Sequence, residues 1–176
     1  SLLWLGRAPT PRPVIELASV VRVDGAATRT ADHGSVQPPQ RLAPGHGILI
    51  GDVLQTRPGT RLVLRRPGGL SLHLGPDSTA TWESADELHL LHGVIYVDTE
   101  GAGSRDGLVL VTHAGRIRHI GTRFGVEVDD RHVRVTVRDG AVRIASAAGP
   151  HEIGAGSEAR SNVEGLDRHR TRARRG

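Results

Sequence analysis

Short apolar runs with a period of two, separated by turn signals, constrain this chain more than any other feature. Apolar and polar residues alternate within residues 70–74, 124–128 and 133–137, and Gly, Pro and Asp interrupt the chain about every 8–12 residues. Successive side chains of a strand point to opposite faces, so this pattern places one face in a core and the other in water. The sequence therefore predicts an all-β domain, either a short-strand β-solenoid or a rolled double sheet, with little or no helix.

Two local patterns refine this prediction. Asp139-Gly140 separates two apolar runs and indicates a hairpin or a tight corner, because Gly tolerates positive φ. Residues 84–91 begin with the spacing of a helix capping box, but so short a segment makes a marginal helix. The residues that follow, 94–97, have the composition of a strand, so we expect a strand here.

Composition changes at both ends of the chain. An apolar start with Trp4 at its edge, followed by a Pro-rich stretch, predicts that residues 1–13 form a membrane-proximal end and a linker, with a disordered end as the alternative. Residues 14–160 hold the strand pattern and form the predicted domain, in which residues 31–47 indicate a long surface loop. Residues 161–176 have few apolar side chains and predict a basic flexible tail or the start of a further domain.

The aromatic and charged residues exclude one class of partner. The aromatic side chains are Trp4, Trp82, Tyr96 and Phe124, too few for a platform that stacks single-stranded nucleic acid. All 23 basic residues are Arg and the net charge is +4, but five of these Arg lie within the last nine residues. The rest of the chain is nearly balanced in charge, so we expect no nucleic-acid partner.

The sequence shows no residue set that predicts catalysis. The chain has no Cys, and its ten His lack the spacing of metal ligands. No Ser stands in the context of a nucleophile elbow. The acidic pairs Asp98/Glu100 and Asp129/Asp130 fall at turns or strand ends, where solvated acids are common. We therefore predict no enzyme, no cofactor and no metal site.

Three arginines are the candidate for a charged surface. Arg134, Arg138 and Arg143 lie on the polar positions of two neighbouring apolar runs. On one sheet face they would form a basic stripe for an acidic partner. Charges on alternating strand positions more often keep a sheet soluble and protect its edges, and we favour that interpretation.

A set of turn and core residues resembles one protein family. The matching stretches extend from about residue 50 to residue 144, and the most specific of them is Gly-Thr-x-Phe-x-Val at residues 121–126. The residues that carry the pattern are Gly51, Asp52, Thr56, Gly93, Gly121, Thr122, Phe124, Val126, Gly140 and Val142. Their order and spacing resemble the FecR family, the iron-regulon transmembrane sensors and anti-sigma regulators of Gram-negative bacteria. At residues 67–69 the chain has Pro-Gly-Gly where the family usually has Asp-Gly or Asn-Gly, a departure that keeps the turn.

The resemblance implies a function in signalling. A domain of this kind would receive a signal from the signalling domain of a TonB-dependent outer-membrane transporter. It would pass the signal to an extracytoplasmic-function sigma factor through a cytoplasmic region outside this chain. The resemblance also implies a periplasmic location, with an inner-membrane helix N-terminal to this chain.

The residues themselves leave a second class open. A non-catalytic cell-envelope module that binds glycan or peptidoglycan would use aromatic side chains, for which Trp82 and Tyr96 are the candidates on strands. A homodimer is also left open. We expect Gly93, Gly121 and Gly140 at corners where a Cβ is unfavourable, and we assign the motif residues structural roles, with Thr122 in a corner hydrogen bond and Phe124 in the core.

Overall fold

The structure is a computed structural model that describes residues 15–31, 37–99, 106–162 and 165–170, so the expected linker at residues 1–13 lies outside it. The described residues form strands and turns without a helix, which confirms the all-β prediction. In chain order the strands are β1 (Ala18–Asp24), β2 (Ala27–Ala31), β3 (Gln40–Arg41), β4 (Gly47–Ile48), β5 (Asp52–Thr56), β6 (Arg61–Arg65), β7 (Ser71–Leu74), β8 (Thr79–Ser84), β9 (Glu87–Asp98), β10 (Val109–Thr112), β11 (Gly115–Val128), β12 (Val133–Ser146), β13 (Gly149–Gly154), β14 (Ser157–Asn162) and β15 (Gly165–Arg170).

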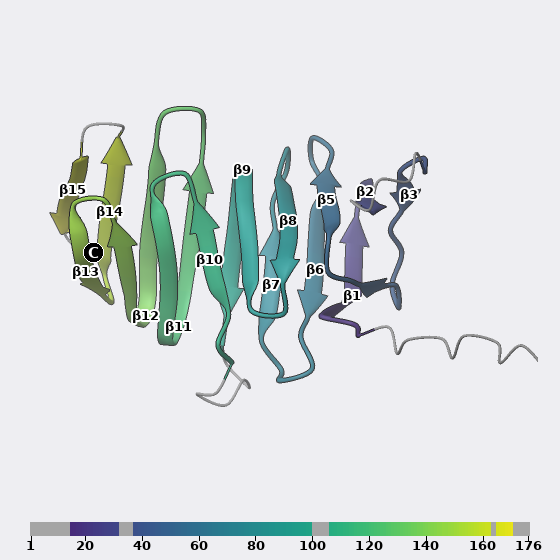
Figure 1. The fold of residues 1–176 in the computed structure, drawn as a ribbon, viewed down its shortest axis with the longest axis horizontal. Helices are drawn as coiled ribbons and strands as arrows, with labels where there is room; N and C mark the ends of the chain where they lie inside the picture. Colours follow the sequence, from purple (N-terminus) through teal and green to yellow (C-terminus); the bar gives the residue numbers. More distant parts are fainter. Residues whose placement is uncertain (1–14, 32–36, 100–105, 163–164, 171–176) are drawn as a thin grey trace, which may run out of the picture.

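The strands form one sheet that is rolled into two layers (Figure 1). Layer A contains β15, β14, the first half of β12, the second halves of β11 and β9, and then β7, β6, β1 and β4. Layer B contains β13, the second half of β12, the first half of β11, β10, the first half of β9, and then β8, β5, β2 and β3. All described pairs are antiparallel except β9 with β10, so the fold is the rolled double sheet and not a solenoid of parallel coils.

Three long strands belong to both layers and join them. β9, β11 and β12 are 12, 14 and 14 residues long, and each changes its neighbours part of the way along. In β12, residues 133–137 pair with β14, whereas residues 141–146 pair with β13. The strand therefore bends at Asp139-Gly140 without reversing, which makes this dipeptide a tight corner and not a hairpin.

The core lies between the layers and is mainly aliphatic. Leu72, Leu74, Val133, Val135 and Val137 are all buried, as the period of two predicts. Each such side chain contributes about 1.5–3 kcal/mol when it is fully removed from water. The aromatic side chains of Trp82 and Phe124 are the largest in this core.

Two expectations about irregular segments are wrong in part. Residues 165–170 form β15, which pairs with β14, so the flexible tail expected from residue 161 does not begin there; residues 171–176 lie outside the described part. Residues 31–47 include β3 and a buried Leu42, so part of the expected loop is sheet. Strands at the edge of a sheet form through backbone hydrogen bonds, and a polar sequence is therefore a weak guide there. The strand favoured for residues 84–91 is confirmed, with a tight turn between β8 and β9.

Candidate functional site

Several of the motif residues lie at corners where the chain passes between the two layers. The corner of β9 shows the arrangement most simply. Gly93 has a φ of +95°, and the next residue, Val94, donates its backbone N–H to Ser78 Oγ at 2.9 Å. A Cβ at Gly93 would overlap with Ser78, so the corner needs glycine both for its conformation and for its space.

The corners of β11 and β12 repeat this arrangement side by side. Gly121 has a φ of +58°, and the next residue, Thr122, donates its N–H to Thr99 Oγ1 at 2.7 Å. Gly140 has a φ of +72°, and the next residue, Ala141, accepts a hydrogen bond from Thr122 Oγ1 at 2.7 Å. The backbone N–H of Thr122 therefore bonds to the hydroxyl of Thr99, and the hydroxyl of Thr122 bonds to the next corner, which links the two corners.

A fourth corner follows the same rule between β1 and β2. Gly25 has a φ of +108°, and Ala26 donates its N–H to Thr60 Oγ1 at 2.9 Å. In all four corners a glycine with positive φ is followed by a residue whose backbone bonds to a Ser or Thr hydroxyl from another segment. Three of these hydroxyl residues, Thr60, Ser78 and Thr99, were missed as corner contacts by the sequence analysis. The signal available for two of them was their place directly beside a turn, in Gly59-Thr60 and Asp77-Ser78.

Thr56 fixes the connection between β7 and β8. Its hydroxyl donates to the carbonyl of Gly75 at 2.7 Å and accepts the N–H of Ser78 at 2.9 Å. Ser78 in turn accepts the N–H of Val94 at the corner of β9, so Thr56 supports that corner through Ser78. A buried backbone group without a partner is unfavourable by about 1–3 kcal/mol, which explains a hydroxyl at this position.

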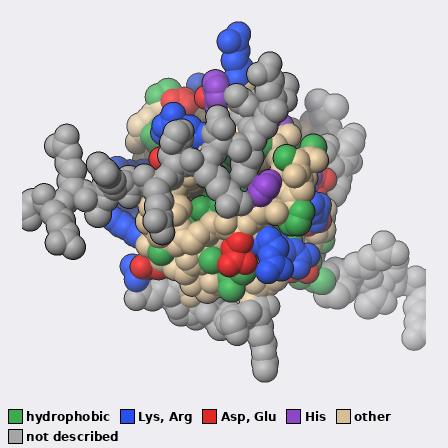
Figure 2. Space-filling model, turned by 90° about the vertical axis from the view of Figure 1, so that its left-hand side faces the viewer, with side chains coloured by type: hydrophobic (Ala, Val, Ile, Leu, Met, Phe, Trp, Pro, Cys, Tyr) green, Lys and Arg blue, Asp and Glu red, His purple; other side chains and the backbone are tan. Residues whose placement is uncertain are grey.

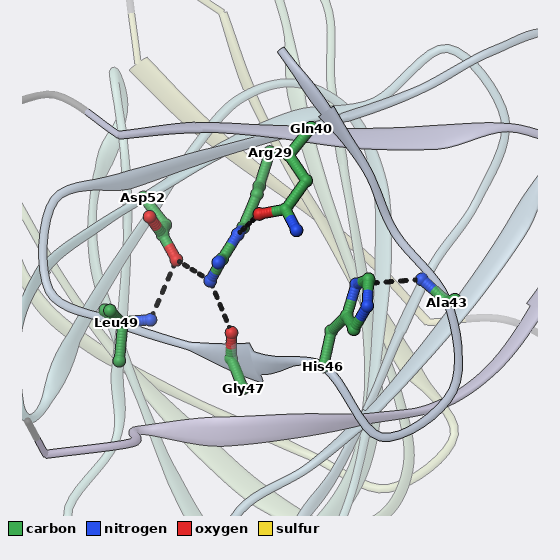
Figure 3. A network of polar contacts seen from close by, with 7 residues as sticks. All are labelled: Arg29, Gln40, Ala43, His46, Gly47, Leu49 and Asp52. Atoms are coloured by element: carbon green, nitrogen blue, oxygen red, sulfur yellow. Dashed lines mark hydrogen bonds and ion pairs between the residues drawn. The ribbon is translucent and has the colours of Figure 1, made fainter. Parts of the chain in front are cut away.

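Gly51 and Asp52 lie at the end of the roll near β2, β3 and β4, where Asp52 contacts Arg29 and Leu49 (Figure 3). Gly51 has a φ of +84° and donates its N–H to the carbonyl of Trp82. Asp52 is 2% exposed, and its Oδ2 accepts the N–H of Leu49 at 2.9 Å and lies 3.3 Å from Arg29 Nη1. The same Arg29 nitrogen donates to the carbonyl of Gly47 at 2.6 Å, so this partly buried ion pair connects β2 with the loop that leads into β5.

The remaining motif residues are core side chains. Phe124, Val126 and Val142 are all 2% exposed or less. Phe124 and Val126 lie on the layer A half of β11, and Val142 lies on the layer B half of β12. None of the three presents its side chain to a ligand, so the motif as a whole describes corners and core.

The basic stripe considered for three arginines does not form. Arg134 and Arg138 precede the corner at Gly140 and lie in layer A, whereas Arg143 follows it and lies in layer B. Arg134 contacts Glu127 and Glu158, and Arg143 contacts Glu152. On the end of the roll formed by β13 and β14, red and blue side chains lie next to one another on the described surface (Figure 2). This favours the interpretation of these arginines as solubilising residues.

A polar cluster surrounds one side of Trp82. The Arg66 guanidinium lies 5.7 Å from the centre of the Trp82 ring, and Arg66 Nε lies 3.1 Å from Asp106 Oδ2. His119 is near this pair, and burial lowers the pKa of its imidazole, against the opposing effect of Asp106. Trp82 is 0% exposed, so it is not available as a glycan-binding ring.

Of the acidic residues considered for catalysis, Asp129 has a structural role. Asp129 accepts the N–H groups of Arg131 and His132 in the turn between β11 and β12, and these bonds hold the pKa of Asp129 below its usual value. Glu100 lies outside the described residues. Within the described part of the chain, no three His, Cys, Asp or Glu side chains are placed to hold a metal ion. The same part contains no helix with the length and hydropathy of a membrane span.

The fold and the motif positions define a class: a two-layer, all-β domain whose characteristic residues shape corners between layers. The sequence model of the FecR protein family matches residues 52–143, which include the corners of β9, β11 and β12. The chain belongs to the FecR family, whose members are non-enzymatic regulators.

Two solved structures share the fold. Both are crystal structures of a candidate anti-sigma factor from Parabacteroides distasonis, with TM-scores of 0.55 and 0.54 at 16% and 17% sequence identity. Each alignment covers 67% of this chain and 59% of the solved chain, so this chain spans about three fifths of that protein. At this identity the likeness shows the fold alone. No curated protein matches this chain closely enough to be a relative.

Proposed function

We propose that this chain is the signal-receiving domain of a FecR-like transmembrane regulator that controls iron uptake. The domain lies in the periplasm, and a helix N-terminal to this chain anchors the regulator in the inner membrane. It receives a signal from the signalling domain of a TonB-dependent outer-membrane transporter, and the regulator passes this signal to an extracytoplasmic-function sigma factor. The family match over residues 52–143 is the observation that carries the proposal.

Edge-strand addition is the mode of partner binding that this fold favours. β13 forms one edge of layer B and pairs only with β12 among the described strands. It has six residues, whereas β3 and β4 at the other end of the roll have two each. The backbone groups on the outer side of β13 can extend the sheet with a strand from a partner, which requires few specific side chains.

Two experiments test the role and the location. Isothermal titration calorimetry of this chain with the signalling domain of its transporter should show a saturable complex. A full-length regulator with alkaline phosphatase fused after this chain should be active in the phosphatase assay, because that enzyme folds in the periplasm. An inactive fusion would contradict the location, and the absence of a complex would contradict the proposed partner.

The binding mode is tested by proline at adjacent positions of β13, His151→Pro and Glu152→Pro. Neighbouring residues of an edge strand direct their N–H groups alternately toward β12 and toward solvent. One variant should therefore lower the melting temperature, and the other should keep the fold but lose the partner. If the folded variant binds the signalling domain with unchanged affinity, addition at β13 is wrong.

The glycan-binding alternative has weaker support in this structure. Of its two candidate aromatic residues, Trp82 is buried beneath Arg66, and Tyr96 alone reaches the outer surface. Titration with soluble muropeptides separates the two functions. Saturable binding of a muropeptide, without binding of the transporter domain, would favour the alternative.

A further inference from the structure

A groove on the outer face of layer A is the surface that none of these roles explains. It has a volume of about 430 Å³ and lies over β1, β6, β7 and β9. Its position follows from the register of these strands. Val63 pairs with His73 and His73 pairs with Tyr96, so the outward side chains of three strands form one row across the groove.

A glycine lines the groove two positions along the chain from His73. Gly75 follows Leu74, which pairs with Leu62, so Gly75 lies across from Arg61 on β6. On its other side Gly75 donates its N–H to the carbonyl of Val94 at 2.8 Å. A Cβ at Gly75 would lie 3.3 Å from the Cβ of Val94, so the glycine lets Val94 lie close to β7 at the edge of the groove.

The apolar wall of the groove is formed by β9. Val94 is 38% exposed, and Tyr96 contacts His73 edge to face, with the ring centres 6.0 Å apart. Burial lowers the pKa of His73, against the opposing effect of Asp98, so this imidazole stays neutral at neutral pH. With Val63, these side chains make a surface suited to a bulky apolar group.

The opposite wall carries positive charge. Arg61 makes no ion pair or side-chain hydrogen bond with any described residue. Arg22 pairs with Asp24 at 2.8 Å, but both side chains are largely exposed, so this pair contributes little. Asp24 is also the cross-strand neighbour of Arg61 in the register of β1 and β6, so two guanidinium groups share one carboxylate and the wall keeps a single excess positive charge.

We propose that this groove binds an extended peptide segment of a partner protein in which an acidic side chain stands next to a bulky apolar one. The carboxylate pairs with Arg61, and the apolar side chain lies in the groove against Val94 and Tyr96. A neutral glycan fits less well, because it leaves the excess positive charge of this wall uncompensated. This inference goes beyond the relay proposed above and does not depend on it, because it concerns the chemistry that one surface binds.

The test is a titration of the ¹⁵N-labelled chain followed by NMR. The probe is an acetylated tetrapeptide that alternates aspartate with phenylalanine. Two matched peptides replace aspartate with lysine or phenylalanine with serine. We expect saturable shifts at the amides of Val63, His73 and Val94 with the first peptide, and binding about fivefold weaker or more with each of the others.

Paired variants separate the groove from nonspecific charge effects. Arg61→Glu should weaken binding about fivefold or more, whereas Arg65→Glu, the same change at the other exposed end of β6, should leave it unchanged. Val94→Ser should weaken binding, whereas Val21→Ser, at a similarly exposed valine outside the groove, should not. The melting temperature of each of the four variants is measured to confirm that it is folded, and binding is compared well below that temperature.

Several results would overturn the proposal. Shifts spread over the whole surface, or an equal loss of affinity for Arg61→Glu and Arg65→Glu, would show that binding is only electrostatic. Localised shifts with a muropeptide but none with the acidic peptide would assign the groove to glycan. If the unmodified chain binds the acidic peptide as expected but does not bind the transporter domain, the relay is contradicted and this inference stands.

Discussion

The substitution Gly140→Ala, compared with Gly121→Ala, tests whether the corners of the roll depend on space as well as on backbone conformation. The two glycines lie beside each other in neighbouring strands, and both have a left-handed backbone, with φ of +72° and +58°. They differ in their surroundings. A Cβ at Gly121 would meet no atom within 4 Å, whereas a Cβ at Gly140 would lie under 3.0 Å from the carbonyl oxygen of Gly121.

The structure sets the expected size of each effect. A left-handed conformation is unfavourable for alanine by about 1–2 kcal/mol, and this applies at both positions. At Gly140 the clash is with backbone, which cannot rotate away, and forced displacement of packed atoms adds about 1–3 kcal/mol. We therefore expect Gly121→Ala to lower the free energy of unfolding by about 1–2 kcal/mol and Gly140→Ala by about 2–5 kcal/mol.

Urea unfolding followed by circular dichroism measures this difference. With a slope of about 2 kcal/mol per molar urea, a gap of about 2 kcal/mol moves the midpoint by about 1 M. The slope itself should stay the same, because both variants retain the roll. If the two alanine variants lose equal stability, the close approach of Gly140 to the neighbouring corner has no energetic effect, and the role of space in shaping the corners is refuted.

Other substitutions test the hydroxyl contacts, the core, the buried ion pair and the histidines. Thr122→Val should lower the free energy of unfolding by about 1–3 kcal/mol, because it leaves buried backbone groups unpaired, and Thr122→Ser should restore most of the loss; equal losses would contradict the hydrogen-bond role. Phe124→Ala should destabilise by about 3–5 kcal/mol in the same urea assay, and a loss below about 1 kcal/mol would show that the ring is not packed. In a double-mutant cycle, Asp52→Ala and Arg29→Ala should couple by about 0.5–3 kcal/mol, whereas simple additivity would show that the pair is not formed in solution. Because the pKa of His119 is lowered in the folded state, the unfolded state binds a proton there more readily, and the free energy of unfolding should fall as the pH drops below about 6.5. His119→Gln should reduce this loss of stability, measured as the difference between urea curves at about pH 7.5 and 5.5. An unchanged pH dependence in this variant would exclude His119 as its source.

The sequence predicted the strands and the core well because both follow from a local pattern. In residues 133–137 the alternation of Val with Arg and Thr sets which side chains point inward, and a shift by one residue would expose all three valines. The corner at Asp139-Gly140 could be expected for a similar reason. Glycine is the residue that tolerates the positive φ found there, and the apolar period changes phase on either side of it.

Contacts between distant segments could not be predicted in the same way. The hydroxyl of Thr60 bonds to Ala26, 34 residues away, and that of Thr99 bonds to Thr122, 23 residues away. Nothing in the local sequence distinguishes these hydroxyls from others beside turns. The basic stripe, which was the less favoured interpretation of the three arginines, does not form for a related reason: the corner in β12 places Arg143 in a different layer from Arg134.

The groove depends on both kinds of information. Its outward row of Val63, His73 and Tyr96 follows from alternation within each strand, but the row exists only because the three strands pair in this register. Tyr96 was noted in the sequence as an aromatic strand residue, whereas Arg61 and Gly75 carry no signal of a site. A groove lined by residues of four strands becomes visible only when the pairing of those strands is known.

The two-layer corners also restrict how such a domain can transmit a signal. β9, β11 and β12 each form part of both layers, so sliding of one layer over the other would break the backbone pairs on either side of Gly93, Gly121 and Gly140. The hydroxyl contacts at these corners are at least partly buried, and each broken one would leave backbone groups unpaired, at about 1–3 kcal/mol. A partner that binds one layer therefore cannot easily shift that layer against the other. In the proposed relay, a signal would therefore be received through what the edges and outer faces of the domain bind and not through an internal rearrangement. This makes β13 and the groove of layer A the places where recognition should be measured.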